Sequence, residues 1–203
     1  DKWIICDEIH CDLIRRGVTF TPIMNVAPEY ADRIVVCTAP SKTFNLAGLQ
    51  VSNIFIPDDA LRRKFEQAVA ASGYSQLNTM GLVACEAAYR YGEEWYDAVK
   101  AYIRENLAYA QHFLEEQIPQ VKAVKPEGTY LLWVDFRSLG LSRKELEELI
   151  VKKAGLWLDS GDIFGAAGRG FERINVACPR SVLTEALERL AREVRKKEPI
   201  VCK

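Results

Sequence analysis

The chain has 203 residues, of which 49% are hydrophobic, and its 27 Lys and Arg side chains nearly balance 28 Asp and Glu for a net charge of −1. This composition is typical of ordinary globular proteins, and it excludes disordered and fibrous classes and disfavours a nucleic-acid partner, which would require a basic surplus. No stretch approaches the roughly 20 apolar residues of a membrane span and no secretory signal pattern is seen, so we expect no membrane partner and a cytoplasmic location.

The sequence begins with an apolar run, WIIC at residues 3–6, followed directly by Asp7 and Glu8. Such a run is typical of a strand that is buried on both faces of a parallel sheet. Because a buried strand requires neighbouring strands, we expect the chain to be a piece of a longer one.

Further elements follow from periodicity, caps and turn residues. Up to residue 57 the pattern predicts strands at 34–39 and 49–56. Asp58 and Asp59 are expected to cap a helix at 60–71, and the next predicted helices cover 78–91 and 93–117. Beyond Pro119 the pattern predicts strands at 121–124, 130–136, 156–158 and 173–178, with helices at 143–154 and 181–196. This last region is expected to be a small α+β unit.

The six cysteines lie at positions 6, 11, 37, 85, 178 and 202, and the two histidines at 10 and 112. No C-x-x-C pair is present, so the sequence offers no local scaffold for a zinc site, and we expect no metal. We expect Cys6, Cys37, Cys85 and Cys178 to be reduced core residues, since they lie in apolar runs.

Two segments carry candidate chemistry. Asp7 and Glu8 follow a predicted strand, and the carboxyl ends of strands in open α/β sheets are where ligands bind, although a solvated loop carboxylate or a helix cap is an alternative. Lys42 follows the second strand in the segment PSKTFNLAGL, where partial desolvation would free its amine to act as a nucleophile. The alternative for Lys42 is an ordinary surface lysine.

Together these segments resemble fold-type I pyridoxal-phosphate enzymes. The resemblance rests on IICDEIHCDL, APSKTFNLAGLQVSNIFI, NTMGLVACEAAYRYGEEW, PEGTYLLWVDF and GDIFGAAGRGFERINVACPR, and it extends over essentially the whole chain. It is closest to the bacterial cystathionine β-lyase or C–S lyase branch, which is grouped with class I/II aminotransferases. The resemblance implies an α/β fold with part of a large cofactor domain at 1–92, a long bridging helix at 93–118 and a small α+β domain at 119–203.

The resemblance also implies roles for individual residues. Lys42 matches the lysine that forms a Schiff base with pyridoxal 5'-phosphate and moves the proton at Cα. Asp7 matches the aspartate that pairs with the pyridine nitrogen, and His10 lies where relatives have a residue near the phenolic oxygen. Ser41 is expected to help hold the phosphate. Position 50, where many relatives have a phosphate-binding arginine, is Gln50 here, which fits the lyase branch better.

Arg173 matches the arginine that binds the substrate's α-carboxylate, because a guanidinium donates two parallel hydrogen bonds and stays charged. Arg169 and Arg180 are alternatives for this role. Trp133 and Tyr130 are candidates for the pocket wall, although aromatic residues in a strand are more often core.

The implied activity is a C–S β-lyase that converts cystathionine or a cysteine S-conjugate to a thiol, pyruvate and ammonia, in a homodimer that acts on an amino-acid substrate. An aminotransferase remains an alternative, and so does a non-catalytic binding or regulatory module. The phosphate loop of the family normally precedes the motif at Asp7. We therefore expect this chain alone to bind the cofactor weakly and to be nearly inactive.

Overall fold

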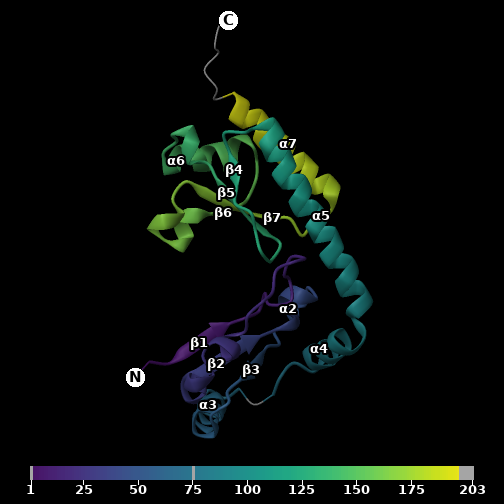
Figure 1. Ribbon diagram of the computed structural model, residues 1–203, viewed down its shortest axis with the longest axis vertical. Helices are drawn as coiled ribbons and strands as arrows, with labels where there is room; N and C mark the ends of the chain where they lie inside the picture. Colours follow the sequence, from purple (N-terminus) through teal and green to yellow (C-terminus); the bar gives the residue numbers. More distant parts are fainter. Residues whose placement is uncertain (1, 75, 197–203) are drawn as a thin grey trace, which may run out of the picture. The chain divides into compact units, whose positions relative to one another are not determined.

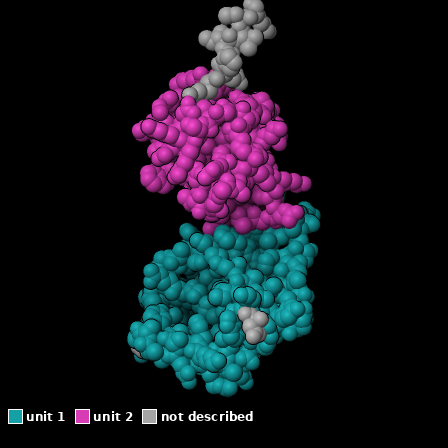
Figure 2. Space-filling model, turned by 90° about the vertical axis from the view of Figure 1, so that its left-hand side faces the viewer, with its two compact units in different colours: residues 1–99 teal, residues 100–203 magenta. Residues whose placement is uncertain are grey.

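The computed structural model describes residues 2–74 and 76–196. The chain divides into two compact units, residues 1–99 and 100–203 (Figure 2). The first unit holds the sheet β1-β2-β3 and the second holds the sheet β4-β5-β7-β6. The division falls inside helix α5 (Glu93–Gln117), which matches the single long helix predicted from the periodicity.

The first unit alternates short strands with helices (Figure 1). Its elements are β1 (Ile4–Asp7), α1 (Ile23–Val26), β2 (Ile34–Thr38), α2 (Pro40–Thr43), β3 (Asn53–Phe55), α3 (Asp59–Ala71) and α4 (Thr79–Tyr91). Strands β1 and β2 are parallel, and β3 is antiparallel to β2. Of the two predicted caps of α3, Asp58 is confirmed, since its carboxylate accepts the Leu61 N–H, whereas Asp59 is the first residue of the helix. Helix α4 is capped by Asn78, whose side chain accepts the Met80 N–H.

Strand β1 differs from its prediction. Trp3 and Ile5 are 62% and 74% exposed, so a strand buried on both faces is wrong for this part of the chain. The reason is that β1 is an edge strand, which pairs only with β2 among the described residues. Strand β3 is also shorter than predicted, because Gln50 adopts a left-handed conformation (φ 54°) that interrupts the extended chain before it.

The second unit packs helices against an antiparallel sheet. Its elements after α5 are β4 (Lys122–Ala123), β5 (Leu131–Asp135), α6 (Arg143–Glu147), β6 (Asp159–Ser160), β7 (Phe171–Asn175) and α7 (Arg180–Arg195). Helices α5 and α7 run side by side (Figure 1), and apolar side chains from both helices and from the sheet form the core. The buried members include Leu107, Leu114, Leu132, Val134, Leu187 and Leu190.

Two elements of this unit also differ from their predictions. The helix expected at 143–154 is α-helical only to Glu147 and continues as a π-helix over Glu148–Lys153. The strand expected at 156–158 is not formed, because the Leu156 N–H bonds back to the Ile150 carbonyl instead of to a neighbouring strand. Strand β6 begins directly after this segment, at Asp159. Strand β7 begins and ends earlier than the predicted 173–178.

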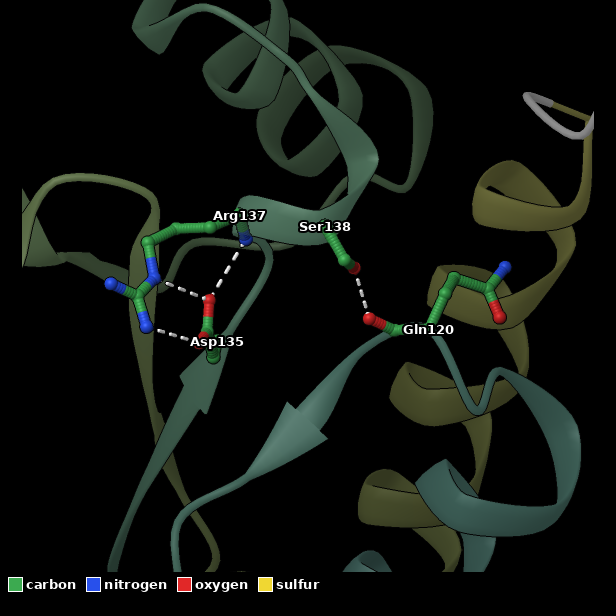
Figure 3. A network of polar contacts seen from close by, with 4 residues as sticks. All are labelled: Gln120, Asp135, Arg137 and Ser138. Atoms are coloured by element: carbon green, nitrogen blue, oxygen red, sulfur yellow. Dashed lines mark hydrogen bonds and ion pairs between the residues drawn. The ribbon is translucent and has the colours of Figure 1, made fainter.

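A polar network closes the end of β5 (Figure 3). The Asp135 carboxylate accepts the Arg137 backbone N–H at 2.9 Å and two guanidinium N–H groups at 3.0 and 2.7 Å. Next to it, the Ser138 hydroxyl donates to the Gln120 carbonyl. The Arg137 guanidinium holds the pKa of Asp135 below its usual value, so this pair remains ionised at neutral pH.

The five described cysteines, at 6, 11, 37, 85 and 178, are free thiols. All are half-buried, so the prediction that four of them belong to the core is wrong. Burial raises the pKa of the Cys11 thiol to about 11, which keeps it protonated and unreactive. Cys202 lies outside the described residues.

The side chain of Asn106 forms hydrogen bonds that connect helix α5 with the residues after strand β7. This fully buried side chain donates to the carbonyls of Val176 (2.8 Å) and Cys178 (2.9 Å) and accepts from the Arg180 guanidinium at 2.7 Å. Each of these buried polar groups loses its partner if the amide is removed.

We therefore expect Asn106→Leu to lower the free energy of unfolding by about 3 kcal/mol, because two carbonyls and a guanidinium lose their partner. Urea denaturation followed by circular dichroism measures this. The neighbouring exposed Glu105 is the matched control, and Glu105→Leu should change stability by less than about 0.5 kcal/mol. Equal effects from both substitutions would contradict the assigned role.

Candidate active site

The site residues of the first unit lie at one edge of its sheet. In the parallel pair β1–β2, Asp7 is opposite Cys37, so both strands reach their carboxyl ends at the same edge. Asp7 is the last residue of β1, and Lys42 follows β2 in the short helix α2. This edge is where open α/β sheets bind ligands.

Helix α2 is held in place by Thr43. Pro40 occupies its first turn, where a fixed φ favours the helical conformation, and the Phe44 N–H bonds back to the Pro40 carbonyl. The Thr43 side chain is 2% exposed and its hydroxyl donates to the Asp12 carboxylate at 2.8 Å. This bond ties the lysine-bearing turn to the loop that follows β1.

Aromatic packing supports the same turn. The Phe44 ring contacts the rings of Tyr89, Trp95 and Tyr96, with centroids 5.5, 6.0 and 6.1 Å away. Gly92 lies against this ring; a Cβ there would come within 2.7 Å of Phe44. The Tyr96 hydroxyl in turn donates to the Asp12 carbonyl, so the helix junction and the loop stabilise one another.

The two acidic residues after β1 have different environments. Glu8 is buried, and its carboxylate accepts the Ile23 N–H at 2.8 Å and the Cys6 thiol at 3.5 Å. Asp7 is exposed, and its carboxylate accepts one described hydrogen bond, from the Ile9 N–H at 3.2 Å. Glu8 therefore has a structural role, and Asp7 is the carboxylate available to a ligand.

His10, Ser41 and Lys42 lie at the same edge, each half-buried. His10 is in the turn after Asp7, where its carbonyl accepts the Leu13 N–H, and the Ser41 carbonyl accepts the Leu46 N–H. Among the described residues no hydrogen bond or ion pair involves the Lys42 amine. The edge thus presents an amine, a carboxylate, an imidazole and a hydroxyl.

Arg173 belongs to the second unit, on β7. Its Nε and Nη2 donate to one oxygen of Asp159 on β6, at 3.1 and 2.6 Å. The guanidinium lies 4.7 Å from the centre of the Phe164 ring, and Trp133 is its partner residue on β5. Burial raises the pKa of the nearby Tyr130, and the Arg173 charge opposes part of that shift.

The two alternative arginines differ from Arg173. The Arg180 guanidinium donates to Asn106 and lies 4.5 Å from the Tyr109 ring, so it is committed to the core contact described above. Arg169 is 76% exposed and forms a 3.7 Å ion pair with Asp162. Arg173 therefore differs from Arg180, which is committed to Asn106, and from Arg169, which is largely exposed.

The sequence matches the family described as "Aminotransferase class I and II" over residues 1–190. The chain belongs to this family. A cystathionine beta-lyase, PatB of Bacillus subtilis, is 42% identical over 92% of this chain and 48% of its own length. The chain spans about half the length of the curated relatives that it matches.

Two solved structures share the fold of the chain. Cystalysin from Treponema denticola, which contains a pyridoxal 5'-phosphate cofactor, has a TM-score of 0.92 and 40% identity over 97% of this chain and 50% of its own. The PLP-bound C–S lyase from Staphylococcus hominis has a TM-score of 0.84 and 34% identity over 95% and 50%. In the described part of this chain, no helix is long and apolar enough to cross a membrane.

Sequence reasoning missed the residues that hold the site in place. Thr43 and Asp12 are separated by 31 positions, so no local pattern connects them. Asp159 lies just beyond the strand predicted at 156–158, and no local pattern connects it with Arg173, 14 positions later. Within residues 2–74 and 76–196 no cluster of His, Cys, Asp and Glu has the arrangement of a metal site.

We expect Thr43→Val to lower the free energy of unfolding by about 1–3 kcal/mol, because the isosteric side chain leaves the Asp12 carboxylate without its buried donor. Urea denaturation measures the change. The exposed Thr79 at the start of α4 provides the control, and Thr79→Val should stay within about 0.5 kcal/mol of the unmodified chain. A Thr43→Val chain as stable as this control would mean that the bond does not hold α2.

Proposed function

We propose that the chain is the lysine-bearing part of a pyridoxal-phosphate-dependent C–S β-lyase, which releases a thiol, pyruvate and ammonia from cystathionine or a cysteine S-conjugate. The observation that carries the proposal is the shared edge of β1 and β2, where Asp7 ends β1 and Lys42 follows the parallel strand β2 in helix α2. The relatives with 31–42% identity that are named cystathionine beta-lyase or putative cystathionine beta-lyase favour a lyase over an aminotransferase.

The residues at this edge fit the cofactor. Its functional groups are an aldehyde, a ring nitrogen, a phenolic oxygen and a phosphate. A primary amine suits the aldehyde, an exposed carboxylate suits a protonated ring nitrogen, and imidazole and hydroxyl donors suit the oxygen atoms. We assign these roles to Lys42, Asp7, His10 and Ser41 respectively.

When bound, pyridoxal phosphate supplies an electron sink for the charge that forms at the substrate's Cα. With the cofactor bound, Lys42 would hold its aldehyde carbon and, when displaced by the substrate amine, would take the proton from the substrate's Cα, which can then pass to the departing thiolate. Asp7 keeps the ring nitrogen protonated, because a negative charge close to that nitrogen raises its pKa.

Arg173 is proposed to bind the substrate α-carboxylate. One carboxylate oxygen of Asp159 accepts hydrogen bonds from Nε and from one Nη2 hydrogen of Arg173. The two Nη1 hydrogens and the second Nη2 hydrogen can therefore donate to another group. The fork that remains has the geometry for a carboxylate. Asp159 is therefore a positioning residue that fixes the plane of the guanidinium.

The domain roles and the assembly are part of the same proposal. Residues 1–92 contribute to the cofactor domain, 93–118 form the connecting helix, and 119–203 form the small domain. We further propose a cytoplasmic homodimer, in which a second copy completes the site.

The test uses the natural protein that carries this sequence, with cystathionine as the substrate. We expect release of pyruvate and a thiol, and a loss of at least about a thousandfold in kcat for Lys42→Ala, because the nucleophile and proton carrier is removed. The exposed lysine of α3 is the control, and Lys64→Ala should leave kcat unchanged. Transfer of the amino group to a 2-oxo acid without release of a thiol would contradict the lyase and favour the aminotransferase.

A further inference from the structure

A cavity lies in the second unit, on the face of β7 opposite Arg173. Its volume is about 310 Å³. Glu172 and Arg173 are successive residues of β7, so their side chains point to opposite faces of the sheet. The walls of the cavity come from the α6 and π-helical region, from the loop before β6 and from β7.

Glu172 is the unusual residue of this cavity. Its side chain belongs to the face that Val134 and Ile174 share with the core, and the residue is only 4% exposed. No hydrogen bond or ion pair involves its carboxylate among the described residues, although it lines the cavity. Burying a carboxylate without a partner is costly, and Glu side chains are seldom fully buried unless they are paired.

The charges around Glu172 are mostly negative. Three other carboxylates act on Glu172: those of Asp159 and Asp162, which follow Leu158, and that of Glu147 on α6. Asp159 is paired with Arg173, and Asp162 is the ion-pair partner of Arg143 and Arg169. Burial, with these carboxylates, raises the pKa of Glu172 to about 7. A cation that enters the cavity would therefore find carboxylates and would compete with a proton.

Arg143, which is paired with Asp162, and Ser160 also line the cavity, and the rest of its wall is apolar. Ile150 and Val151 come from the π-helical turn, and Trp157 and Ile163 form the exposed part, with Trp157 91% exposed. An aromatic face attracts organic cations, and π-helical turns occur frequently at functional sites. The described carboxylates do not have the arrangement of a metal site, which argues against an inorganic cation. The volume is at the lower end for small-molecule sites.

We propose that this cavity binds a small organic ammonium ion with an apolar body, whose charge pairs with Glu172 and whose apolar part packs against Trp157 and Ile150. Asp159 lines the cavity and also orients Arg173, but binding in the cavity does not depend on the proposed lyase chemistry. An amine that binds there neutralises the buried carboxylate and covers the exposed indole.

The experiment titrates the full chain with benzylammonium chloride and follows the indole N–H signals by NMR, with Trp157 assigned from Trp157→Phe. We expect saturable shifts of the Trp157 signal at pH 8. Because benzylammonium remains charged and Glu172 is protonated at lower pH, the affinity should fall about tenfold at pH 6. Glu172→Gln should weaken binding at least tenfold at pH 8, since it removes the charge and keeps the shape.

Glu188 on α7 is the matched control, because Glu188→Gln removes the same charge from an exposed position in the same unit and should leave the affinity unchanged. Neutral benzyl alcohol and Mg²⁺ complete the comparison. The proposal is overturned if benzyl alcohol binds as well as the amine, if Mg²⁺ produces the same shifts, or if Trp157 does not respond. An affinity for benzylammonium that is the same at pH 6 and pH 8 overturns it without any substitution.

Discussion

The parallel register of β1 and β2 is the constraint on which the candidate site depends. Because Asp7 pairs with Cys37, the two strands end together, and the residues that follow them have to share one edge of the sheet. A one-residue slip would turn Asp7 toward the opposite face and remove it from Lys42. The hydrogen bond from Thr43 to Asp12 and the packing of Phe44 then fix the lysine turn against the loop after β1.

In the second unit, one strand presents opposite charges on opposite faces. On one face of β7, Arg173 is oriented by Asp159 beside an aromatic ring, which leaves part of its fork for a carboxylate. On the other face, Glu172 is buried beside a cavity without a described donor. The alternation of side chains along a strand therefore places two successive residues, one proposed to bind an anion and one proposed to bind a cation, on opposite faces of the sheet.

The long helices and their caps were predictable from the sequence because they depend on local information. The periodicity of α5 and the capping residues Asp58 and Asn78 act over a few positions. The family and the motif residues were also predictable, since IICDEIHCDL and APSKTFNLAGL are contiguous. The exposure of β1, the π-helical turn after Glu147 and the displaced β6 depend on tertiary contacts, and no local pattern indicates them. The same holds for Asp12, Asp159 and the burial of Glu172.

The central claim is that the edge formed by β1 and β2 makes Lys42 the lysine that binds the aldehyde of pyridoxal phosphate. The most direct measurement incubates the chain with pyridoxal phosphate, reduces the product with borohydride and quantifies the label on each lysine by peptide mass spectrometry. The account predicts that Lys42 is labelled well above the exposed Lys64, and that Asp7→Asn reduces the excess. A label spread evenly over the exposed lysines, with no enrichment at Lys42, would contradict it.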